Sequence, residues 1–266
     1  MIPLSEFEKT PRGDAPYRLS ASHPDGKYLA MQAGPGPDGL VWEQETKQIV
    51  WQPERAIALA WLRNGTQIAV FREGSTSSYE FALYSWPKRQ LLQSCPVSPA
   101  LDGWAVDMIV SPQNNLALCM VVNEDDASFE FVDITSQGVS QDVQAGYLLK
   151  GPNDVMRPAF SPDGQLWVCC SQRYESWWAP DPDAEDTYEQ PARGGEYELG
   201  TLLVFRGKQQ PPRTIPLIAT LPAGWLPADP TAIEALFLSD PVFLDAHHVQ
   251  VRLPSGETQV HLVSAD

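Results

Sequence analysis

The sequence has few positive charges. Its 266 residues include 18 Lys or Arg against 34 Asp or Glu, which gives a formal net charge of −16 at pH 7. Binding to nucleic-acid phosphates needs clustered Lys and Arg, and anionic membranes attract polybasic segments, so the charge argues against both kinds of partner. The same charge suits a basic protein partner, although by itself it also confers solubility.

The sequence also lacks long apolar runs. No stretch approaches the roughly 18 apolar residues that a transmembrane helix needs. Residues 1–8 have neither the basic n-region nor the apolar h-region of a secretory signal. We therefore expect a soluble protein that resides in the cytoplasm.

Motifs of metal, cofactor and nucleophilic chemistry are missing as well. The sequence contains no Cys-x-x-Cys, no Gly-x-Ser-x-Gly, no phosphate loop and no His-Glu-x-x-His. The four cysteines fit buried free thiols that act as small apolar residues: Cys95, Cys119, Cys169 and Cys170. His23 and the pair His247-His248 replace turn residues, and with Asp245 the pair is better explained as an exposed turn than as a metal site. The sequence predicts no catalytic residue, no metal and no cofactor.

A repeated turn is the most informative feature that the sequence does contain. The clearest copy, residues 159–169, reads AFSPDGQLWVC, and an apolar strand stands on each side of its Asp-Gly turn. Asp-Gly and Asn-Gly tolerate the positive φ of a tight turn, so each copy predicts a β-hairpin. The strands show little alternation, as expected where both faces of a sheet are covered. Four further copies follow the same register, the last of them degenerate: 110–119, 22–31, 61–70 and 243–251.

A second landmark opens a third strand in three of these units. It consists of an aromatic residue, a glutamate and an apolar residue, and its glutamates are Glu80, Glu130 and Glu198. Tyr79 and Phe129 are 50 residues apart, and so are Asn64 and Asn114. The shared period predicts that the three glutamates occupy equivalent positions. Fourth strands are expected at 48–51, 90–92, 146–149 and 214–218.

Four strands in each unit of about 40–50 residues is the size of a β-propeller blade. The Ser-Pro-Asp-Gly turns, each followed by an apolar strand, resemble those of the WD-repeat and TolB-like propeller families, and the resemblance covers most of the chain. The Trp-Asp pair of true WD repeats is absent, and only Val132-Asp133 comes close to it.

We therefore predict an all-β fold, a single β-propeller domain over residues 1–266 with five four-stranded blades. The last blade supplies only three strands, and residues 2–8 are expected to add the fourth and to close the ring, which leaves no exposed sheet edge. Residues 219–240 are either an elaborate connection or a broken blade. The predicted blades span 17–52, 56–97, 105–150, 155–220 and 238–266 with 2–8, and a loop is inserted at 172–195.

The candidate binding site lies in the insertion. In a propeller, the loops between the second and third strands open on one face, and here these loops are acidic. Tyr and Trp beside carboxylates are favoured at protein-binding hot spots, although the two tryptophans would equally suit a plug at the top of the ring. The sequence thus predicts a non-catalytic scaffold that binds a protein partner through Tyr174, Trp177, Trp178, Asp181, Asp183, Glu185 and Asp186. It does not predict the oligomeric state.

The alternative function is carboxylate-based glycoside hydrolysis. Glu80, Glu130 and Glu198 would then form a ring of acids at the mouth of the channel, with two of them placed for acid–base chemistry. Structural ion pairs are the competing interpretation, because a buried carboxylate needs a partner. Arg72 is the predicted partner of Glu80, and Arg173 that of Glu198. A third alternative is a purely structural domain of a larger complex.

Overall fold

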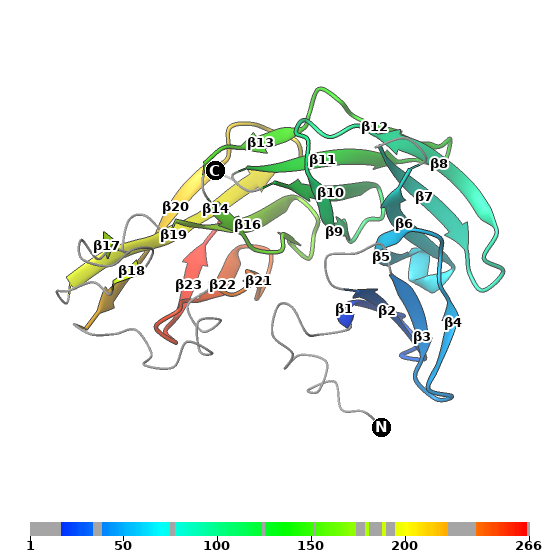
Figure 1. Ribbon diagram of the computed structural model, residues 1–266, viewed down its shortest axis with the longest axis horizontal. Helices are drawn as coiled ribbons and strands as arrows, with labels where there is room; N and C mark the ends of the chain where they lie inside the picture. The colour runs from blue at the N-terminus through cyan, green and yellow to red at the C-terminus, as the bar shows by residue number, and fades with distance from the viewer. Residues whose placement is uncertain are drawn as a thin grey trace. The chain divides into compact units, whose positions relative to one another are not determined.

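The computed structural model describes residues 17–33, 39–74, 78–123, 126–151, 153–173, 179–180, 188–189, 195–222 and 238–264 (Figure 1). Within these ranges the chain consists of antiparallel β-strands, and the helical content is one 3₁₀ turn, η1 (Arg63–Gly65). The all-β class is confirmed. The chain forms two compact units, one of residues 1–123 with 127–149 and one of residues 124–126 with 150–266.

The first unit contains three sheets. The first is ordered β1-β2-β3-β4, from the strands Tyr17–Ser22, Tyr28–Ala33, Leu40–Glu43 and Gln48–Trp51, shown in blue in Figure 1. The second is ordered β5-β6-β7-β8, from Ala56–Leu62, Gln67–Glu73, Tyr79–Ser85 and Leu91–Val97. The third is ordered β9-β10-β11-β12, with β13 also on β11, from Trp104–Val110, Leu116–Val122, Ala127–Ile134, Val139–Gln141 and Tyr147–Leu149.

The second unit contains one long sheet, one short sheet and a strand pair. The long sheet is ordered β14-β16-β19-β20, with β15 on β16, from Asn153–Val155, Leu166–Arg173, Gly195–Arg206, Arg213–Leu221 and Ala159–Phe160. The short sheet is ordered β21-β22-β23, from Val242–Phe243, His248–Arg252 and Thr258–Leu262. The pair β17 (Ala179–Pro180) and β18 (Tyr188–Glu189) lies within the predicted insertion.

The predicted Asp-Gly hairpins are confirmed. In three sheets the first turn residue donates its backbone N–H to a carbonyl five residues later, and its own carbonyl accepts from the residue three positions on. That fourth turn residue has positive φ, and it is Gly26 (+73°), Asn114 (+56°) or Gly164 (+67°). Glycine and asparagine adopt this conformation at low cost, which explains their place in the repeat.

The predicted fourth strands are found, three of them with different bounds, including β20, which is longer than the predicted 214–218. The strand β8 extends to Val97, well past the predicted 90–92. The region near 146–149 contributes two short strands, β12 and β13, that pair with different parts of the long strand β11. Because β11 has eight residues, it has room for two short partners along the same edge.

The cores lie between and within neighbouring sheets of each unit. In the sheet β5–β8, Phe71, Phe81 and Leu83 pack toward Cys119 and Val121 of the next sheet. The residues that alternate with them, including Ile68 and Val70, pack toward Ala30 and Val41 of the first sheet. This sheet is covered on both faces, as its continuous apolar strands predict. In the second unit, residues of β16, β19, β20, β22 and β23 form one cluster.

Candidate interaction surface

The predicted partner-binding residues lie outside the described residues. This applies to Tyr174, Trp177, Trp178, Asp181, Asp183, Glu185 and Asp186. The predicted closing strand, residues 2–8, and residues 223–237 of the predicted connection also lie outside. The face that these residues were expected to form remains a prediction.

Glu80 forms the ion pair that the sequence predicts. It lies opposite Arg72 in the ladder of β6 and β7. The Arg72 Nε and Nη2 donate to Glu80 Oε2 at 3.0 and 2.7 Å, and Nη1 donates to the Tyr84 hydroxyl at 3.0 Å. Burial acts to raise the pKa of Glu80, but hydrogen bonds from Ser94 and Arg72 and the Arg72 charge outweigh it, so this pKa lies below its ordinary value.

Glu130 is held in a different way. Its side chain is buried, with 2% of the residue exposed. The backbone N–H of Ala100 donates to Oε1 at 2.7 Å, and the Gln141 side-chain amide donates to Oε2 at 3.1 Å. Neutral N–H donors can hold a buried carboxylate in place of a counter-charge. Glu130 thereby connects β11 to the segment between β8 and β9.

The three glutamates do not occupy equivalent positions, so that prediction is wrong. We count from the first turn residue of each hairpin, which is Leu62 between β5 and β6 and Ser111 between β9 and β10. Glu80 lies opposite Arg72, which comes ten residues after Leu62, whereas Glu130 lies opposite Cys119, which comes eight residues after Ser111. Ser128 and Thr201 occupy the place of Glu80. The 50-residue spacing misleads because the loop between β10 and β11 is one residue shorter than that between β6 and β7, and the preceding turns are offset.

Glu130 instead takes an apolar position of the repeat. The equivalent residues in the other three sheets are Leu40, Ala82 and Leu203, all of them buried. Glu198 lies further along its strand and is exposed, and the Arg173 side chain predicted to pair with it lies outside the described part of the chain. The three glutamates therefore do not share one register position, which is the pattern on which the predicted ring of acids was based.

The segment that Glu130 holds, residues 98–105, is fixed at many points and is here called the tethered segment. Gln141 accepts from the Ser98 N–H and donates to the Ser98 carbonyl, both at 2.8 Å. The Tyr79 hydroxyl donates to the Gly103 carbonyl at 2.7 Å and accepts from the Ala105 N–H at 3.0 Å. Side chains of three other strands thus satisfy backbone groups that lack a partner in a ladder.

Gly103 is required by the close packing of the tethered segment. A Cβ at this position would overlap the Val122 carbonyl oxygen and the Leu101 side chain. Leu101 itself is buried, and the Asn123 amide lies at hydrogen-bonding distance, 3.5 Å, from the Asp102 carbonyl. The backbone on either side of residue 104 therefore has little freedom.

Trp104 stands at the exposed end of this fixed segment. Of the residue, 61% is exposed, whereas every other Trp, Tyr and Phe whose burial the structure describes is buried or half-buried. Tyr79 holds the backbone of both of its neighbours, Gly103 and Ala105. Exposed Trp is enriched at protein-binding hot spots, and a site that is already ordered loses less entropy on binding. This residue was not predicted from the sequence, because it falls in the strand that precedes the repeated turn.

A charge pattern in the sequence marks the same region. Residues 90–149 contain no Lys, Arg or His, and they contain eight Asp or Glu residues. This range covers the tethered segment and the whole sheet β9–β13. The pattern can be read from the sequence, and it distinguishes the sheet β9–β13 from the neighbouring sheets, which carry both signs of charge.

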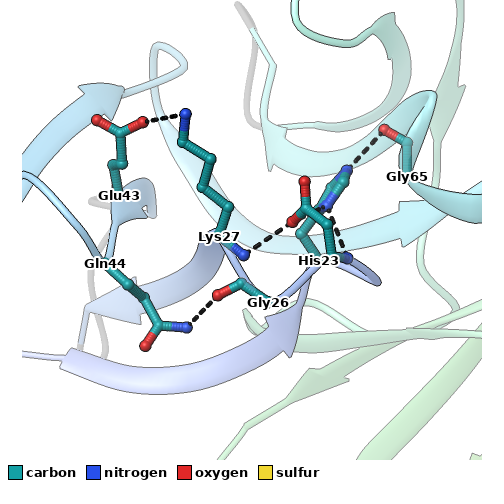
Figure 2. Close-up of polar contacts among 7 residues, drawn as sticks. His23, Gly26, Lys27, Glu43, Gln44 and Gly65 are labelled. Atoms are coloured by element: carbon teal, nitrogen blue, oxygen red, sulfur yellow. Dashed lines mark hydrogen bonds and ion pairs between the residues drawn. The ribbon is translucent and has the colours of Figure 1, made fainter.

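His23 and Asp25 make a pair that superficially suits acid–base chemistry (Figure 2). The His23 Nδ1 lies 2.6 Å from Asp25 Oδ1, and Nε2 donates to the Gly65 carbonyl at 3.1 Å. The ring packs edge-on against Trp61 and Tyr28, and a Cβ on Gly65 would overlap it. One ring nitrogen therefore contacts its own turn and the other contacts the turn of the neighbouring sheet. The His23–Asp25 pair thus has a structural role.

The same turn is braced on its other side (Figure 2). Lys27 Nζ lies 3.0 Å from Glu43 Oε1, and the Gln44 amide donates to the Gly26 carbonyl at 2.5 Å. His23 takes the turn position at which the fourth sheet has Ser161, whose hydroxyl lies 2.6 Å from Asp163. The substitution preserves the contact with the aspartate and adds a link between sheets.

The other reactive residues are also in structural settings. All four cysteines are buried and unpaired, and burial raises the pKa of the Cys95 thiol to about 11. Asp245 accepts the backbone N–H groups of His247 and His248, as in a capped turn. In the described ranges, no group of three or more His, Cys, Asp or Glu side chains has the geometry of a metal site. None of the helices described there is long and apolar enough to cross a membrane.

Antiparallel sheets of four or five strands that follow one another along the chain, three of them with the same turn geometry, are typical of a β-propeller. Solved structures agree at the level of the fold. The chain is 14% identical to Kuenenia stuttgartiensis hydrazine synthase, with a TM-score of 0.57 over 93% of this chain and 64% of that chain. The Swd1 (Cps50) β-propeller domain of Myceliophteria thermophila gives 10% identity and a TM-score of 0.53, over 94% of this chain and 67% of that one.

KlAtg21, in a complex with the coiled coil of AgAtg16, gives 9% identity and a TM-score of 0.54, over 90% of this chain and 64% of that chain. The resemblance to WD-repeat-like propellers is therefore confirmed, and at such low identity it shows the fold alone. The chain spans just under two thirds of the hydrazine synthase and KlAtg21 chains. No protein-family model matches the sequence, and no curated protein matches it.

Proposed function

We propose that the protein is a non-catalytic, cytoplasmic β-propeller scaffold that binds a protein partner. The observation that carries the proposal is Trp104, a large exposed aromatic residue on a segment whose backbone is already fixed by Tyr79, Gln141 and Glu130. Interfaces gain most from such anchors because they bury apolar area at a low entropic cost. KlAtg21, which has a similar fold, is found in a complex with a coiled coil, and this supports a partner of the same general kind.

The proposal includes a five-bladed ring closed by residues 2–8. Four of the described sheets have four or five strands, and the sheet β21–β23 has three. One further strand on this sheet would give five blades of at least four strands each and would cover its edge, which otherwise invites aggregation. Four unpaired cysteines support the cytoplasmic location, because secreted proteins favour disulfides.

The proposal also includes a second contact region in the acidic insertion at 172–195. Its support is the composition of the loop. Tyr174, Trp177 and Trp178 are followed within a few residues of the sequence by Asp181, Asp183, Glu185 and Asp186. An aromatic residue beside carboxylates suits a partner that carries basic and apolar groups. Trp104 and the insertion would then contribute separate parts of one scaffold.

The test is affinity purification of the tagged protein from its own cells, followed by mass spectrometry. Three variants are compared with the wild type: W104A, the double variant W177A/W178A, and L92A as an exposed apolar control. We expect a stoichiometric partner that is reduced in the first two variants and retained in the third. If no partner is enriched with the wild type, or if all variants retain it equally, the scaffold proposal is wrong in this form.

A further inference from the structure

The surface around Trp104 has a feature that bears on the chemistry of its partner. Among the described residues, no cation and no other aromatic ring lies against the Trp104 ring, although the ring is mostly exposed. Elsewhere in the same unit, cations do cover aromatic rings. The Arg89 guanidinium lies 5.6 Å from the centre of a Trp86 ring, and Lys27 Nζ lies 5.3 Å from that of Tyr28.

The lack of a cation at Trp104 follows from the local sequence. The nearest Lys or Arg residues along the chain are Arg89 and Lys150, so no basic side chain is available within the sheet β9–β13 or the tethered segment. Asp102, two residues before Trp104, is exposed. An exposed indole two residues along the chain from an exposed carboxylate, in a sheet without positive charge, is complementary to a cationic side chain.

We propose that Trp104 and Asp102 bind an arginine- or lysine-bearing segment of the partner protein. A guanidinium or ammonium group would stack on the indole, and Asp102 would supply the opposite charge. This inference rests on the proposed scaffold function and adds the chemistry of the ligand. The fixed backbone around Gly103 means that the segment binds a surface that is already formed.

The experiment uses the full-length protein labelled with ¹⁵N and follows the indole N–H signals of its nine tryptophans. The W104F variant identifies the Trp104 signal by its loss. The probes are three capped hexapeptides in which glycine alternates with arginine, with lysine or with glutamate. We expect the Trp104 signal to move with the two cationic peptides and to stay in place with the acidic one.

The affinities of variants for the arginine peptide distinguish binding at Trp104 from non-specific attraction to the negative net charge of the chain. We expect W104A to bind at least five-fold more weakly than the wild type, and D102N two- to three-fold more weakly. The L92A control should bind within two-fold of the wild type. Equal binding by W104A and the wild type would mean that the peptide responds only to the net charge, and it would overturn the inference.

A second measurement distinguishes this inference from the proposed function. A photoreactive tryptophan analogue at position 104, which keeps the aromatic ring, is crosslinked to the partner identified by purification, and the crosslinked segment is sequenced. A segment that contains Arg or Lys supports the inference. A segment without either, or a second copy of this chain, overturns the basic-segment inference. A partner that is not crosslinked at position 104 overturns it too, while the purified partner still supports a scaffold.

Discussion

The sheets β5–β8 and β9–β13 lie next to one another and accommodate carboxylates in opposite ways. In the first, Glu80 pairs with Arg72, and further cations lie nearby. In the second, which has no cation, Glu130 sits at an apolar position of the repeat and is held by an N–H of Ala100 and the Gln141 amide. An ion pair such as Arg72–Glu80 neutralises charge within its own sheet. The neutral donors of Glu130 add no positive charge to their sheet, and they join Glu130 to the tethered segment. The segment that Glu130 holds also carries the exposed Trp104.

The largest expected effect is that of Glu130→Ala. The change leaves the Ala100 N–H without its acceptor and opens a cavity at the buried Glu130 position, so we expect the free energy of unfolding to fall by about 2–4 kcal/mol. Urea denaturation of the two proteins measures the difference. Glu130→Gln keeps an acceptor oxygen and should cost about 1 kcal/mol. Equal losses in both variants would show that the charge itself, and not the acceptor, holds the segment.

Arg72→Met tests the other half of the comparison. The pair with Glu80 is only partly exposed, and its loss should lower the free energy of unfolding by about 1–2 kcal/mol at pH 7. Because the folded pKa of Glu80 is below its ordinary value of 4.5, this stability is present above that value and is lost as the pH falls below it. The difference between wild type and variant should therefore shrink in urea titrations at acidic pH. A difference that stays constant down to pH 3 would contradict the ion-pair account.

Tyr79→Phe tests whether the hydroxyl fixes the tethered segment. It removes two hydrogen bonds at the protein surface, so we expect a loss of about 1 kcal/mol in the free energy of unfolding. If the hydroxyl also orders Trp104 for binding, the affinity for the arginine peptide falls by two- to three-fold even where the protein is fully folded. Tyr84→Phe loses a hydroxyl that contacts Arg72 instead and should leave the affinity unchanged. A loss of affinity in both variants would point to a general loosening of the sheets.

The smallest effect concerns the thiols of the two sheets, Cys95 and Cys119. Burial raises both pKa values, that of Cys95 to about 11 and that of Cys119 well above its ordinary value. The native protein should react slowly with a thiol reagent at pH 8, and the rate at Cys95 should rise about ten-fold per pH unit, because only the thiolate reacts. Mass spectrometry after timed labelling identifies the modified residue. Labelling of Cys119 before Cys95 would contradict the burial assigned to the two sheets.

The sequence by itself determined the strands, the turns and the all-β class. These follow from local chemistry, because a glycine or asparagine is needed where φ is positive, as at Gly26 and Asn114, and because continuous apolar strands indicate two covered faces. It also predicted the pairing of Arg72 with Glu80, since both belong to one hairpin. The likeness to WD-repeat-like propellers followed from these same features.

The tertiary structure alone decided what Glu130 and Trp104 do. The ladder register depends on the lengths of the loops and on where each turn begins, and the two differences together move Glu130 away from the place of Glu80, although the spacing in the sequence is regular. The exposure of Trp104 depends on side chains from three other strands that hold residues 98–105. Such contacts join residues that are far apart in the chain, so no local pattern records them. The absence of positive charge over residues 90–149 was visible in the sequence, and only the fold showed which surface it affects.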